Sequence, residues 1–197
     1  MQDFPLYFEL GWQHILDWQG YDHILFVIAL CGIYTLKDWR KVLLLVTAFT
    51  LGHSLTLALS IYGKIRPSSA LIEFLIPLTI VATTLHNIVS KKQKPGAVYF
   101  KYLMASLFGL IHGLGFSNYL RSLLGRSTNI VSELFAFNLG LEFGQILIVM
   151  SVLILTFMAM NVFRSPKREW NLFLSSAIFG ISLIMSLERL NIYIQHT

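Results

Sequence analysis

The sequence predicts an all-α membrane protein that crosses the bilayer several times, and three observations indicate this class. Of the 197 residues, 55% are hydrophobic and only 13% are charged, whereas soluble domains average about 25% charged residues. The apolar residues gather in six runs, most of them close to the ~20 residues that a helix needs to cross a hydrocarbon core. The alternating pattern of a membrane barrel is absent, so helices are the expected spanning structure.

A single transmembrane domain is expected over residues 1–197, in which residues 1–21 form an outer interfacial segment. The part from Phe4 to Trp18 is apolar but is interrupted by acidic residues and a histidine, so we expect a helix that lies on the membrane surface. Six spanning helices are expected after it. They are placed near 23–37, 41–62, 69–89, 99–120, 135–160 and 171–190.

Short polar or basic breaks separate these six runs. The first run is the shortest and begins at His23. The breaks that carry the basic residues are Lys37–Lys41, Gly63–Pro67, Lys91–Gly96 and Arg164–Arg168. Because no break is long enough to form a domain, the chain is expected to lie almost wholly within or against the membrane.

The basic residues also predict the orientation of the helices. If the six helices alternate in direction, ten of the 15 Lys and Arg residues lie on one side of the membrane and five on the other. The richer side is expected to be cytoplasmic, which places both termini outside. Because the basic residues lie in clusters between apolar runs, the net charge of +5 is a topology signal, and nucleic acid is not an expected partner.

Ionisable side chains inside the predicted spans are the residues that suggest a function. A charged side chain near the bilayer centre costs at least about 2.5–3.5 kcal/mol, so each one needs a partner or a role. On the predicted orientation these residues share the outer half of the membrane or its midplane, whereas His86 lies at the cytoplasmic end. The set consists of the ionisable residues Asp22, His23, His53, Glu73, His112, Glu142 and Glu188 and the uncharged Gln145.

Spacing along the helices indicates that several of these side chains face one another. Asn138, Glu142 and Gln145 are separated by four and three residues and therefore share one helix face. His53 and Thr56 share a face in the same way. Imidazole and carboxylate groups together are the ligand set of zinc, nickel, cobalt and manganese ions. The pattern therefore predicts a divalent-metal site.

Three of the polar residues also have simpler explanations. Glu188 adjoins Arg189 and can form an interfacial ion pair with it, and Glu73 can cap its helix or face water at the rim. His86 is alone at its level of the membrane, so we expect it to make a hydrogen bond between helices. The single cysteine, Cys31, excludes an intrachain disulfide and a cysteine-based zinc cluster.

Four motifs of the chain resemble those of the HupE/UreJ family, in the same order and over most of the membrane portion. They are HILDWQGYDHILF from His14, HSLTL from His53, GLIHGLGF from Gly109 and NLGLEFGQ from Asn138. Seven residues lie between His14 and Asp22, where the nickel-type pattern has five, and the GLIHGLGF motif has one histidine instead of two. The sequence is therefore similar to the second, less characterised branch of the family.

The resemblance implies a small multi-pass protein of a bacterial-type inner (plasma) membrane. Many members are associated with hydrogenase or urease maturation, and some are regarded as nickel or cobalt permeases. Carried over to this chain, the resemblance implies the metal ligands His14, Asp22, His23, His53, His112 and Glu142, with Asn138 and Gln145 as supporting groups. Glu73, Thr56 and Glu188 complete the supporting polar set that we expect.

Three functions agree with these observations. The first is a permease for a divalent ion such as nickel, cobalt or zinc, with its site in the outer half of the membrane. The second is an intramembrane metal-dependent hydrolase that acts on a lipid or lipid-linked substrate, in which Glu142 or Glu73 would be the general base. The third is a structural or sensor protein locked by a metal ion. The expected partners are the lipid bilayer and the metal ion, and the sequence is compatible with an oligomer.

Overall fold

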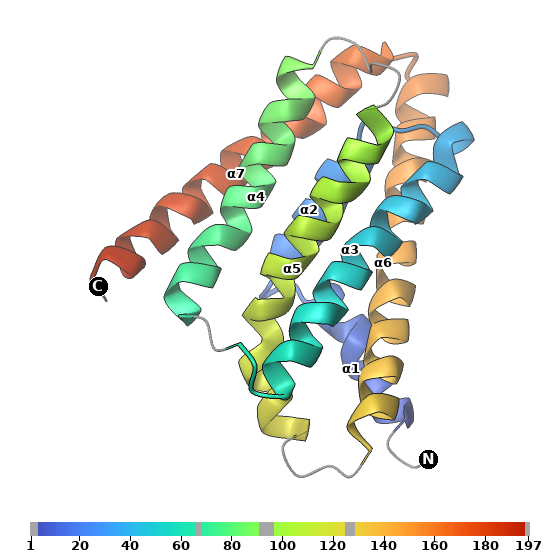
Figure 1. The fold of residues 1–197 in the computed structure, drawn as a ribbon. Helices are drawn as coiled ribbons and strands as arrows, with labels where there is room; N and C mark the ends of the chain where they lie inside the picture. The colour runs from blue at the N-terminus through green and yellow to red at the C-terminus, as the bar shows by residue number, and fades with distance from the viewer. Residues whose placement is uncertain (1–3, 66–67, 91–96, 125–128, 196–197) are drawn as a thin grey trace.

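Within the residues that the structure describes (4–65, 68–90, 97–124 and 129–195), the computed structural model of the chain contains seven α-helices and no strand. They form an elongated bundle (Figure 1), which confirms the predicted all-α class. The helices are α1 (Phe4–Ile15), α2 (Asp22–Cys31), α3 (Trp39–Ile61), α4 (Ser69–Val89), α5 (Ala97–Leu124), α6 (Ile130–Asn161) and α7 (Lys167–Gln195), and a 3-10 turn, η1 (Leu36–Asp38), precedes α3.

Five of these helices, α3 to α7, are long and apolar enough to cross a membrane. The first predicted span, 23–37, is different, because α2 ends at Cys31. Thr35 then starts a new helical turn with a capping box, in which its backbone N–H and its hydroxyl both donate to the Asp38 carboxylate, at 3.4 and 3.1 Å. The helix therefore stops earlier than the apolar pattern predicts.

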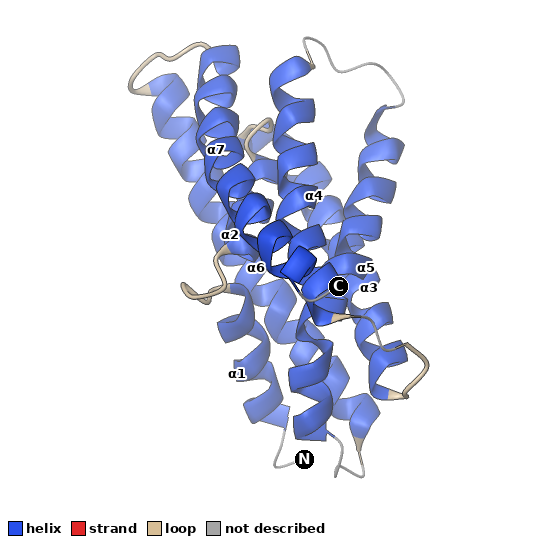
Figure 2. Cartoon of the chain, turned by 90° about the vertical axis from the view of Figure 1, so that its left-hand side faces the viewer, coloured by secondary structure: helices blue, strands red, loops and turns tan. Residues whose placement is uncertain are grey.

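The segment that we expected to lie on the membrane surface forms α1, which packs lengthwise against α6. A side chain on Gly11 of α1 would overlap the backbone of Phe137, and a side chain on Gly140 of α6 would overlap the backbone of Phe8. Glycines on both helices thus let the two backbones touch. Figure 2 shows α1 and α2 following each other along the bundle, so the two short helices together form one interrupted helical segment.

Helices α3 and α5 form a second closely packed pair, and each carries one of the predicted site residues. A side chain on Gly109 of α5 would overlap the backbone oxygen of Phe49, and one on Gly113 would overlap the backbone oxygen of His53. These contacts place His53 of α3 and His112 of α5 in the same layer of the bundle. Helices α4 and α7 pack against each other at the side of this group (Figure 1).

Candidate metal centre

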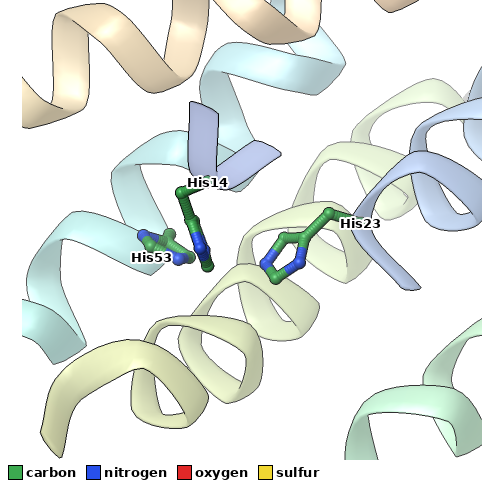
Figure 3. A group of neighbouring side chains, drawn as sticks. All are labelled: His14, His23 and His53. Carbon is green, nitrogen blue, oxygen red and sulfur yellow. The ribbon is translucent and has the colours of Figure 1, made fainter. Parts of the chain in front are cut away.

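Three histidines converge at the break between α1 and α2. His14 lies in the last turn of α1, His23 in the first turn of α2, and His53 in α3. One ring nitrogen of each lies within 4.8 Å of the corresponding nitrogens of the other two, and the three rings point toward a common space (Figure 3). Because each ring comes from a different helix, folding of the bundle is what assembles the group.

Most of the ring nitrogens of this three-histidine group lack hydrogen-bond partners among the described residues. His14 Nε2, His23 Nε2 and both nitrogens of His53 are buried and accept or donate no hydrogen bond within the described chain. A buried polar atom without a partner costs about 1–3 kcal/mol, and such atoms are rare in folded proteins. Several of them at one point fit a metal ion, which would accept the lone pairs of neutral imidazoles.

Asp22 contacts the Nδ1 side of the His23 ring and orients the ring. The Asp22 Oδ1 atom lies 2.9 Å from His23 Nδ1 and also accepts the backbone N–H of His23 at 2.8 Å. An ionised carboxylate only accepts hydrogen bonds, so Nδ1 carries the proton and Nε2 keeps the lone pair. This carboxylate–histidine pairing is typical of metal sites, where it fixes the ligand ring and raises its basicity. Asp22 therefore acts on the centre through His23.

His112 adjoins the three-histidine group without belonging to it. Its ring centroid lies 4.9 Å from that of His23, and its Nε2 atom lies 3.1 Å from Thr79 Oγ1. The Thr79 hydroxyl donates its own hydrogen to the Ile76 carbonyl at 2.7 Å, so it must accept from His112 Nε2–H. The lone pair of His112 is then on Nδ1, which is buried and has no described partner.

The polar residues of α6 that we expected near the metal hold α6 to α3. Thr47 donates to Glu142 Oε1 at 2.6 Å, and Thr50 donates to Gln145 Oε1 at 2.8 Å. Glu142 is not a member of the three-histidine group. Asn138, one turn earlier, keeps a buried side-chain oxygen without a described partner.

Three further residues of the predicted supporting set lie outside the group. Thr56 donates to backbone oxygens of its own helix, at 3.1 Å for that of His53. Glu73 forms an ion pair with Arg189 of α7 at 2.7 Å, and both side chains are 47% exposed. Glu188 is exposed, and Arg189, the next residue in the chain, pairs with Glu73.

Three threonines that the sequence analysis did not select, Thr47, Thr50 and Thr79, contact predicted site residues. Each one hydrogen-bonds to a predicted residue on another helix. A threonine in an apolar helix gives no signal of its own, because its hydroxyl most often bonds back to its own helix. Spacing does connect Thr47 and Thr50, which are three residues apart, to Glu142 and Gln145, which are also three apart.

A pocket leads from the surface of the bundle to His14. It is lined by Leu10, Gln13, His14, Asp17, Phe116 and Tyr119. The Phe116 ring lies against His14, with 3.9 Å between ring centroids, and stacks on Phe137 at 5.3 Å. A metal ion would thus reach the three-histidine group through this partly polar pocket, past the ring of Phe116.

Comparison with known families gives one match over most of the chain. A family model described as HupE / UreJ protein matches residues 1–190, a range that includes the three-histidine group and His112. No match was found among curated proteins or among solved structures. Because the matched range covers nearly the whole sequence, the chain belongs to the HupE/UreJ family.

Proposed function

We propose that this protein is a permease for a divalent transition-metal ion in a bacterial-type inner membrane. The observation that carries the proposal is the three-histidine group, in which unpaired imidazole nitrogens from three helices meet within 4.8 Å. Membership of a family of membrane proteins related to nickel and cobalt transport agrees with it. The transported ion is a substrate, so the site must both capture it and release it.

The donor set selects borderline divalent ions. Three neutral imidazoles suit nickel, cobalt and zinc, whereas hard ions such as magnesium and calcium prefer oxygen ligands. Thiolate chemistry is not available, because the single cysteine, Cys31, is buried and belongs to the apolar core. The Asp22 carboxylate behind His23 offsets part of the charge of a bound dication.

A line of polar groups continues from the centre toward the other end of the bundle. Thr79 contacts His112 as described above, and Thr83, one turn further along α4, donates to the backbone oxygen of Thr79 at 2.8 Å. Thr83, His86 and Asn87 then line a second cavity. Weak hydroxyl contacts of this kind suit an exit route, because conduction needs sites that release the ion. A closed structural site would not need this line.

The geometry does not favour the hydrolase. Of its two candidate bases, Glu142 accepts a hydrogen bond from Thr47 outside the three-histidine group, and Glu73 forms a surface ion pair. Neither carboxylate is placed to activate a water molecule on a metal held by His14, His23 and His53.

The test is uptake of nickel, cobalt and zinc ions into proteoliposomes that contain the purified protein. We expect uptake of at least one ion above empty vesicles, and His53→Ala should abolish both uptake and binding. His86→Ala is the matched control for binding, because His86 is exposed and bonds to Ser90 of its own helix region. Binding without uptake of any ion would refute the permease and leave the metal-locked structural protein.

The orientation is part of the same proposal. We propose six passes, with α1 and α2 as the first, and both termini outside. The turn between α6 and α7 would then face the cytoplasm. A reporter inserted at Ser165 should give a cytoplasmic signal, and a signal from the opposite side would invert the direction in which the ion meets the centre.

A further inference from the structure

A second cavity lies at the end of the bundle opposite to the start of α1. It has a volume of about 220 Å³ and lies between α4 and α5, with the end of α2 behind it. Most of its lining is apolar and includes Leu30, Ile33, Met104 and Phe108. Ala82 and His86 of its wall are exposed on the side of the bundle, so the cavity is open in the direction where lipid would lie.

One lysine side chain, Lys101 of α5, lines this mostly apolar space beside Thr83, His86 and Asn87. Its ammonium group lies 5.4 Å from the centroid of the Tyr34 ring, and no carboxylate of the described residues lies within ion-pair distance of it. Asp38, an acidic residue near this end, is paired with Lys41 at 2.8 Å. A half-buried ammonium group above an apolar groove therefore has no anion in the described protein to complement it.

From this combination we infer that the cavity binds an anionic phospholipid, with an acyl chain between α4 and α5 and the phosphate at Lys101. Basic pockets between membrane helices recognise anionic headgroups in this way. The positive charge at this end of the bundle favours an anionic over a zwitterionic lipid. Lys37 lies in η1, Arg40 at the start of α3, and Lys167 and Arg168 at the start of α7. The inference does not depend on metal transport.

A bound phosphate at this position would also act on the proposed exit route. Thr83 and Lys101 line the same cavity, so the ammonium group repels a cation that leaves the line of threonines. An anionic headgroup would neutralise that charge and supply oxygen atoms at the end of the route.

The test measures lipid retention by the purified full chain, without added metal. Native mass spectrometry would compare phosphatidylglycerol with phosphatidylcholine of the same acyl composition. We expect the wild type to retain phosphatidylglycerol preferentially, and Lys101→Gln to weaken that retention about fivefold, the effect of one basic residue near a membrane surface. Lys37→Gln is the matched control, because it removes the same charge from the same end outside the cavity.

A second variant tests the acyl chain separately from the headgroup. Ala82→Trp fills the groove from an exposed position, so it should reduce retention of both lipids while circular dichroism shows an unchanged helical fold. Equal retention of the two lipids by the wild type would overturn the inference. Equal losses in Lys101→Gln and Lys37→Gln would also overturn it, because a general surface charge would then explain the binding.

Discussion

Replacing Asp22 by asparagine should weaken metal binding without removing a ligand. The Asp22 carboxylate accepts hydrogen bonds from both the ring and the backbone of His23, at 2.9 and 2.8 Å. Loss of such a partner behind a ligand costs about 10- to 100-fold in metal affinity, or about 1.4–2.7 kcal/mol. An asparagine oxygen can still accept a hydrogen bond from Nδ1–H but carries no charge. We therefore expect Asp22→Asn to weaken metal affinity about tenfold and Asp22→Ala to weaken it about 100-fold.

The assay is isothermal titration calorimetry of the purified protein with nickel, cobalt and zinc ions. Asp17→Asn is the matched control, because it removes one carboxylate from the segment that connects α1 to α2, close in the chain to Asp22. Asp17 is exposed and bonds to the backbone of Gln19 at 2.9 Å, with no hydrogen bond to a histidine of the centre in the described chain. His23→Ala sets the scale for complete loss of a ligand.

Two results would refute this reasoning about Asp22. If Asp22→Asn and Asp17→Asn changed the affinity equally, net charge would explain the effect and the orientation of the ring would not. If Asp22→Asn abolished binding as fully as His23→Ala, Asp22 would be a direct ligand, as the family resemblance implies.

Three further predictions follow from particular contacts. Gly113→Ala should lower both thermal stability and metal affinity, because its Cβ would overlap the backbone of α3 at His53. Gly180→Ala in α7 is the control, because the space around Gly180 is open. It should be neutral in thermal unfolding or stabilising by up to about 1 kcal/mol. Glu73→Gln should change the free energy of unfolding by less than about 1 kcal/mol, because the ion pair of Glu73 is exposed. Metal affinity should stay near that of the wild type, and a drop below one tenth would contradict the position of Glu73 outside the centre. Phe116→Ala should speed metal association in stopped-flow measurements, because the ring lies against the histidine at the pocket, and an unchanged rate would show that this ring does not limit access.

The five long helices were predictable from the sequence, and the break of the first predicted span into shorter helices was not. Runs of apolar residues near the length of a bilayer leave few alternatives to a spanning helix, and α4 begins and ends at the predicted residues, 69 and 89. The helices α1 and α2 are each too short to show that length. What holds α1 in place is Gly11 against the backbone of α6, a contact that exists only once both helices are formed.

The candidate centre was predictable in its residue types and less so in their roles. His23 and His53 stood out because imidazole inside an apolar span needs a reason, and both lie in the three-histidine group. His14 lies in a segment that did not resemble a span, so only the family resemblance indicated it. Asp22 and Glu142 were both expected to bind metal, but hydrogen-bond geometry separates them, since one orients a ligand and the other joins α3 to α6.

In the proposed six-pass orientation, the interruption between α1 and α2 links the geometry of the first pass to metal binding at the candidate centre. Backbone outside a helix is tolerated within a membrane only where it is buried in protein or lines a cavity, and interrupted helices form the binding sites of many transporters. Here His14 precedes the break and His23 follows it, while His53 stands on the continuous helix α3. A metal ion bound by all three therefore fixes the angle between α1 and α2. Conversely, a rearrangement of the connecting segment 16–21 that moves α1 relative to α2 would separate His14 from His23 without unfolding a long helix, and the proposed permease needs such a way to release its ion.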